Sequence, residues 1–102
     1  MKKIVDGKTY NTDTAELMES YQYGYTNDFG WFREYLYVTS KGNHFLYGKG
    51  GPLSHYAEHY DNSSMGGEDI VPLTREEAFD WAQRYNLVEV IGKTFSDMCQ
   101  DA

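Results

Sequence analysis

Cysteine is nearly absent from this chain of 102 residues, since Cys99 is its only one. A single cysteine excludes an internal disulfide and a zinc site built from several cysteines. Cys99 also lies close to the C-terminal Ala102, where a thiol would lack the formed surroundings that lower its pKa. We therefore expect no thiol chemistry.

Long apolar runs are also missing. No segment approaches the roughly 20 apolar residues that a membrane-spanning helix needs. The N-terminal segment 2–5 meets Asp6 and Gly7 at once, so it lacks the apolar region of a signal peptide. A hydrophobic content of 40% with 17% aromatic residues nevertheless argues against disorder. We expect a cytoplasmic protein in which residues 1–102 form a single domain.

Basic residues are scarce: nine Lys and Arg stand against sixteen Asp and Glu, for a formal net charge of -7. The imbalance is strongest from Tyr56 to Asp80, which holds seven acids and only Arg75 as a base. Such a field repels nucleic acids and anionic membranes and attracts basic surfaces. Because acidic surfaces also serve solubility alone, the pattern leaves both interpretations open.

Turns and apolar spacing predict an α+β fold, with a small antiparallel sheet built around a central β-hairpin and two main helices. Asp6-Gly7 is a two-residue turn signal and predicts a hairpin between residues 3–5 and 8–10. Asp13, followed by Glu16, forms a capping-box pattern that predicts a helix through about Tyr21.

The central hairpin spans Trp31–Lys49, where Ser40-Lys41-Gly42 fits a three-residue loop with a left-handed glycine. This loop predicts three pairs of opposed residues: Thr39 and Asn43, Tyr37 and Phe45, and Tyr35 and Tyr47. One face of the hairpin is expected to meet the core through Phe32, Leu36, Val38 and Leu46.

The opposite face of this hairpin, the aromatic face, holds five rings beside Arg33. A surface of this kind is either covered by another element or used for recognition. Its rings are Trp31, Tyr35, Tyr37, Phe45 and Tyr47.

In the second half of the chain, residues 54–60 are expected to form a short helical turn and residues 61–67 a polar loop. Pro72 places the extended segment Ile70–Leu73 at a sheet edge. Thr74 and Glu77 form a capping box that predicts a helix to about Tyr85. The apolar run 87–91 is expected to form a last strand.

Few residues carry the signals of catalysis or metal binding. His55 and His59 have the i, i+4 spacing that places two imidazoles on one helix face. A metal site there needs a third ligand, for which the sequence offers His44, Glu58, Asp61 and Cys99. Gly48-Lys49-Gly50-Gly51 lacks the spacing of a phosphate-binding loop. We expect no enzymatic activity and no cofactor, and we keep the histidine pair as a weak metal candidate.

Three segments together carry a resemblance that covers most of the chain. They are Gly7–Ala15, the Leu-Tyr hairpin that ends in Gly50-Gly51, and the Pro-Leu-Thr-x-Glu-Glu-Ala helix start at Pro72. The chain resembles small proteins encoded by phages and mobile elements of Gram-positive bacteria. Such proteins are similar in size, charge and genomic setting to anti-CRISPR proteins, and some of them have that activity.

This resemblance implies a bacterial host cell and a non-enzymatic inhibitor that binds the basic nucleic-acid-binding surface of a CRISPR effector nuclease. Carboxylates would stand where phosphates lie, and tyrosines would add buried area. The predicted contact residues are Tyr56, Glu58, Tyr60, Asp61, Glu68, Asp69, Glu76, Glu77 and Asp80.

A second hypothesis is a mobile-element accessory protein that binds its partner through the aromatic face. A third is a small metal-binding module that uses His55 and His59. The aromatic face is also compatible with a homodimer. Direct binding of nucleic acid or of a membrane is not expected, because basic residues are scattered and outnumbered.

Overall fold

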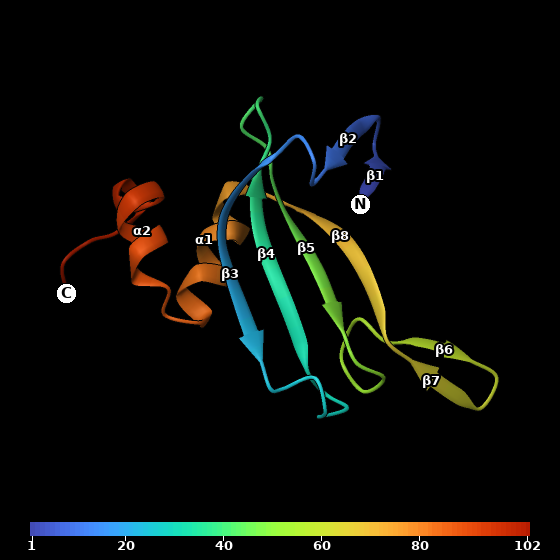
Figure 1. Ribbon diagram of the computed structural model, residues 1–102. Coiled ribbons are helices and arrows are strands. Elements are labelled where there is room, and N and C mark those ends of the chain that lie inside the picture. Colours follow the sequence, from blue (N-terminus) through green and yellow to red (C-terminus); the bar gives the residue numbers. More distant parts are fainter.

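The computed structural model describes all 102 residues, and it places the strands before the helices along the chain (Figure 1). The strands are β1 (Lys2–Val5), β2 (Lys8–Asn11), β3 (Glu16–Tyr23), β4 (Phe32–Val38), β5 (His44–Gly50), β6 (Glu58–Tyr60), β7 (Ser63–Met65) and β8 (Gly67–Leu73). The helices are α1 (Arg75–Arg84), α2 (Val88–Thr94) and a short 3-10 turn at Ser96–Met98.

Four of the strands form the main antiparallel sheet, in the order β3-β4-β5-β8. The pairs β1–β2 and β6–β7 are separate two-stranded hairpins, and β6–β7 projects beyond the end of the sheet in Figure 1. Both helices lie on one side of the sheet. The predicted α+β class and the central hairpin are therefore confirmed.

The turn of the central hairpin has the predicted geometry. Gly42 has a φ of 85°, and the Thr39 N–H donates to the Asn43 carbonyl at 2.8 Å. Tyr37 lies opposite Phe45, and Tyr35 lies opposite Tyr47, so the predicted register is confirmed. The helix after Thr74 is confirmed as well, because Thr74 and Glu77 form both hydrogen bonds of a capping box.

The predicted helix from Asp13 to Tyr21 is wrong, since this segment enters strand β3. The Asp13 N–H donates to the Asn11 side chain at 2.9 Å, so the local turn is organised by Asn11. Ser20 and Tyr21 then pair with Tyr35 and Glu34 of β4. Sheet pairing therefore prevails over the local capping signal in this segment.

Three predictions for the second half of the chain also need correction. Residues 58–60 and 63–65 form the β6–β7 hairpin, where a helical turn and a polar loop were expected. Residues 88–94 form α2, where a strand was expected. Asn86 has a φ of 52° and turns the chain after α1, so Val90 packs into the core. By contrast, β8 is the predicted edge strand.

The two faces of the sheet carry separate cores. On the helix side, Leu36 and Leu46 pack against both helices; the other members of this cluster are Ala78, Trp81, Ala82, Val90 and Phe95. On the opposite side, Tyr10 of β2 covers Phe45 and Ile70, with the Tyr10 and Phe45 rings edge to face at 5.5 Å. The β1–β2 hairpin therefore covers one end of the aromatic face.

Gly48 in β5 has no space for a side chain. A Cβ built at this position would lie 1.9 Å from Cζ and Oη of Tyr56. The Tyr56 ring is itself buried, so it has no open space into which to move. The close approach of the ring to the strand requires glycine at this position.

We predict that Gly48→Ala lowers the free energy of unfolding by about 2 kcal/mol, because the added methyl group displaces a buried ring. Gly92→Ala is the matched control, since a Cβ there would meet no heavy atom within 4 Å. That change should stabilise α2 by about 0.5–1 kcal/mol. Urea unfolding of both variants measures the two effects, and equal effects would contradict the steric argument.

A second prediction concerns His44, which is buried next to Phe95. Burial lowers the pKa of His44, and the positive charge of Arg75 lowers it further. The folded protein therefore favours neutral His44, and the unfolded chain binds more protons below about pH 6.5. The contribution of His44 to stability is present above that pH and is lost as the pH falls.

The expected NMR titration of the His44 ring has a midpoint below about 6.5. Arg75→Gln should raise this midpoint, because it removes the cation. His44→Gln should make the free energy of unfolding less sensitive to pH between about 7.5 and 5.5, roughly the range in which a free histidine titrates. A midpoint at or above 6.5, about the value of an unperturbed histidine, would contradict the prediction.

Candidate functional site

A buried carboxylate, Glu34 of β4, lies at the centre of the helix side of the sheet. Only 4% of this residue is exposed. Its Oε1 accepts the Trp81 Nε1–H at 3.0 Å, and its Oε2 accepts the Tyr56 hydroxyl at 2.5 Å. His55 Nε2 lies 3.2 Å from the same Oε2. A buried carboxylate is costly without such partners, so these contacts hold β4, α1 and the 54–57 segment together.

The Tyr56 hydroxyl is a neutral donor in this cluster. Burial raises the pKa of Tyr56, and the hydrogen bond to Glu34 and the charge of Glu34 raise it further. Tyr56 is only 9% exposed, although it was predicted to face a partner. Tyr56 lies in the interior, where its hydroxyl holds Glu34 in place.

Above this cluster lies a hollow of about 610 Å³, which we call the acidic hollow. Glu34 contributes to it from the buried side, and carboxylates from β6 and β8 contribute from the outer side. Arg84 is the one permanently cationic residue in its lining, and His55 contributes an imidazole. The ten residues that line it are Glu34, Leu46, His55, Tyr56, Ala57, Glu58, Glu68, Asp69, Val71 and Arg84.

The structure brings three of the predicted contact carboxylates, Glu58, Glu68 and Asp69, to this hollow. Asp61 and Tyr60 are exposed on the projecting β6–β7 hairpin, where the Tyr60 hydroxyl donates to Glu58 at 3.0 Å. Glu76, Glu77 and Asp80 are exposed on α1 and do not line the hollow.

Most of the acidic charge is left without a paired cation. Only three of the sixteen carboxylates take part in ion pairs: Asp69 with Lys3, Glu34 with His55, and Asp97 with Arg75. Among the seven predicted contact carboxylates, Asp69 alone is paired. The lining of the hollow therefore carries four carboxylates against the single cation of Arg84.

The aromatic face is divided by the β1–β2 hairpin. Phe45 is fully buried, so it cannot contact a partner, and Tyr37 stacks on it at 5.2 Å. At the open end, Tyr35 and Tyr47 stack at 5.8 Å and remain half-buried. The Tyr47 hydroxyl donates to Glu68 at 2.6 Å; burial and this bond raise the pKa of Tyr47 to about 12. Trp31 packs beside Gly51.

The two candidate metal ligands do not share a helix face. His55 lies in the turn before β6 and contacts Glu34, whereas His59 lies in β6 and bonds Ser64 at 2.8 Å. No three His, Cys, Asp or Glu side chains are grouped in a way that would hold a metal ion. The helical premise of the metal hypothesis is therefore wrong.

Sequence reasoning missed Glu34, the central residue of the site. Its signal was a carboxylate between Phe32 and Leu36, on the face of the hairpin that was predicted to meet the core. A charged residue in that position requires buried donors. These come from Trp81 and Tyr56, which are distant in the sequence.

Comparisons of this chain with protein-family models, with curated proteins and with solved structures found no match. The resemblance to phage and mobile-element proteins therefore stays a prediction. None of the helices has the length and apolar character needed to cross a membrane.

We predict that Tyr56→Phe lowers the free energy of unfolding by about 1.5–3 kcal/mol, because a buried carboxylate loses a donor. Tyr60→Phe is the control, since it removes a hydroxyl that bonds an exposed carboxylate, and its stability should be nearly unchanged. Urea unfolding compares the two variants. Equal stabilities would mean that the hydroxyl of Tyr56 does not support Glu34.

Proposed function

We propose that this protein is a non-enzymatic inhibitor of anti-CRISPR type, which binds the basic nucleic-acid-binding surface of a CRISPR effector nuclease. The observation that carries the proposal is the grouping of unpaired carboxylates around one hollow beside a projecting hairpin. Glu58 and Glu68 are exposed there, and neither belongs to an ion pair.

The chemistry of the proposed partner follows from this charge. CRISPR effectors hold their guide and target in positively charged channels, and a protein with a net charge of -7 is attracted to such channels. The β6–β7 hairpin has all of its strand residues exposed, so Asp61 and Tyr60 can enter a groove ahead of the sheet. The hollow behind it would receive a Lys or Arg side chain between Glu58 and Glu68.

The predicted contact set is refined by the geometry. Glu58, Tyr60, Asp61 and Glu68 form the proposed centre of the contact. Glu76, Glu77 and Asp80 belong to a second acidic area on α1, where Glu77 also caps the helix. Tyr56 is buried and stabilises the fold through its hydrogen bond to Glu34, so it is not part of the proposed contact.

A second candidate function is an accessory protein that binds through the open end of the aromatic face. The observation in its favour is that Tyr35 and Tyr47 stack on each other and stay only half-buried, although Tyr47 also packs against the cluster of Tyr10, Phe45 and Ile70. Arg33 and Lys49 occupy the same two strands, so this surface is less acidic than the hollow.

The proposal predicts that Glu58→Lys with Glu68→Lys weakens binding to a CRISPR effector by about tenfold, because each change replaces an attraction by a repulsion. Inhibition of target cleavage should fall in parallel. The affinity of the unaltered protein should also decrease as salt rises from about 50 to about 500 mM, because charge interactions are increasingly screened over this range. Surface plasmon resonance against purified effectors measures both effects.

The matched control is Asp13→Lys with Asp101→Lys, which changes the net charge equally at exposed sites away from the hollow. Equal loss in both variants would indicate attraction by net charge alone and would contradict a specific site. Loss of binding in Tyr35→Ala with Tyr47→Ala, while Glu58→Lys with Glu68→Lys still binds, would favour the aromatic face.

A further inference from the structure

The two edges of the main sheet are protected in the same way, by the carboxylate of a strand residue. On β8, the Ile70 N–H donates to Asp69 Oδ1 at 2.8 Å. On β3, the Ser20 N–H donates to Glu19 Oε1 at 2.9 Å. Each carboxylate binds a backbone N–H that would otherwise be open to a neighbouring strand.

At the β8 edge, a lysine completes this arrangement. Lys3 of β1 places its Nζ 2.8 Å from Asp69 Oδ1 and 3.2 Å from the Ile70 carbonyl oxygen. One ammonium group thus binds both the protecting carboxylate and the backbone of the edge strand. The β1 strand that carries it lies against β8.

At the β3 edge, the corresponding lysine is missing. The strand pairs with β4 on one side only, and Glu19 belongs to none of the three ion pairs of the protein. The eight residues of β3 include two acids, Glu16 and Glu19, and no base. The edge therefore has the carboxylate and the backbone groups but lacks the cation.

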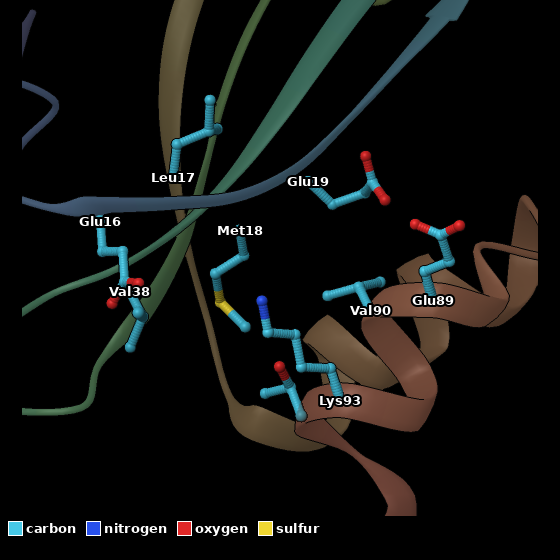
Figure 2. A pocket seen from close by; sticks show the side chains of 9 residues that line it. Glu16, Leu17, Met18, Glu19, Val38, Glu89, Val90 and Lys93 are labelled. Carbon is cyan, nitrogen blue, oxygen red and sulfur yellow. The ribbon is translucent and has the colours of Figure 1, made fainter.

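A groove runs beside this edge, between β3 and α2, with a volume of about 360 Å³ (Figure 2). Met18 and Val90 give it an apolar floor, and Glu19 of β3 and Glu89 of α2 lie on the same side of it. Lys93 extends into the groove next to Met18 without forming an ion pair. An aliphatic stem with a cationic end matches this lining.

We propose that the β3 edge and the adjoining groove bind an extended, lysine-bearing segment of a partner protein as an added antiparallel or parallel strand. One lysine of that segment would bind Glu19 as Lys3 binds Asp69. Another side chain would lie over Met18 and Val90. Addition of a strand to an open edge is a recurrent mode of peptide recognition.

Charge identifies this occupant in preference to a second copy of the chain. Pairing of two β3 strands would bring four glutamates together, from two chains that each carry a net charge of -7. Like charges placed opposite each other destabilise a strand pair. A basic segment removes this repulsion. The site lies apart from the acidic hollow, so its test does not depend on the proposed inhibition.

The test uses ¹⁵N-labelled protein and the peptide acetyl-Thr-Lys-Val-Lys-Val-Lys-Thr-amide. Titration should shift the amide signals of Glu16–Tyr23 and of α2. A peptide of the same sequence that is N-methylated at every lysine and valine keeps the charge but has no lysine or valine N–H to donate from either edge, and it should leave the β3 signals unmoved. Shifts of equal size with both peptides would overturn strand pairing in favour of attraction by charge alone.

Glu19→Gln tests the carboxylate, because glutamine keeps an acceptor for the Ser20 N–H and removes only the charge. It should weaken peptide binding about threefold, the scale of an exposed ion pair. Glu76→Gln, on α1, is the control and should leave the affinity unchanged. Equal weakening in both variants, or β3 shifts that depend on protein concentration without peptide, would overturn the proposal; the latter would identify a second copy as the occupant.

Discussion

The hydrogen bonds of Glu34 are the interaction on which the arrangement of this small domain depends. A carboxylate on the inner face of a sheet is tolerated only when donors surround it, and here its partners come from two separate parts of the chain. Trp81 fixes α1 over the sheet, and Tyr56 and His55 fix the segment that leads into β6. Gly48 makes this arrangement possible, because its lack of a side chain leaves room for the Tyr56 ring. The acidic hollow therefore has a rigid floor, while its outer carboxylates are held in place by strands.

The two proposed contact surfaces would serve different kinds of recognition. Around the hollow, exposed carboxylates supply charge without backbone groups, which suits side chains of a folded basic surface. Along β3, unpaired backbone groups lie beside a carboxylate and an apolar groove, which suits an extended segment. The two surfaces lie near opposite edges of the sheet, β3 and β8, so a protein of this size could bind two regions of one partner. The aromatic face contributes less area than its composition indicates, because Tyr10 covers Phe45.

Features fixed by neighbouring residues were predictable from the sequence, and features fixed by distant packing were not. Gly42 and Thr74 determine a turn and a helix start within a few residues, so both were found. Residues 13–21 carry a helix signal, but pairing with β4 decides the conformation of this segment from Glu16 onward. The role of Glu34 requires Trp81, which lies 47 residues further along the chain. Of the predicted contact residues, Glu58, Glu68 and Asp69 converge, whereas Tyr56 turned out to be internal because its hydroxyl serves Glu34.

The order of elements along the chain has a consequence for biosynthesis. Every helical residue of the larger core lies at or after Ala78, whereas its sheet residues, Leu36 and Leu46, are synthesised much earlier. As the chain leaves the ribosome, the inner face of the sheet has nothing to pack against until α1 and α2 have emerged. Domains fold as units during synthesis, so this one acquires its native core only after translation of its last helix. Until then, the inner face of the sheet, with Glu34 among its apolar residues, lacks the Trp81 partner that covers it in the complete fold.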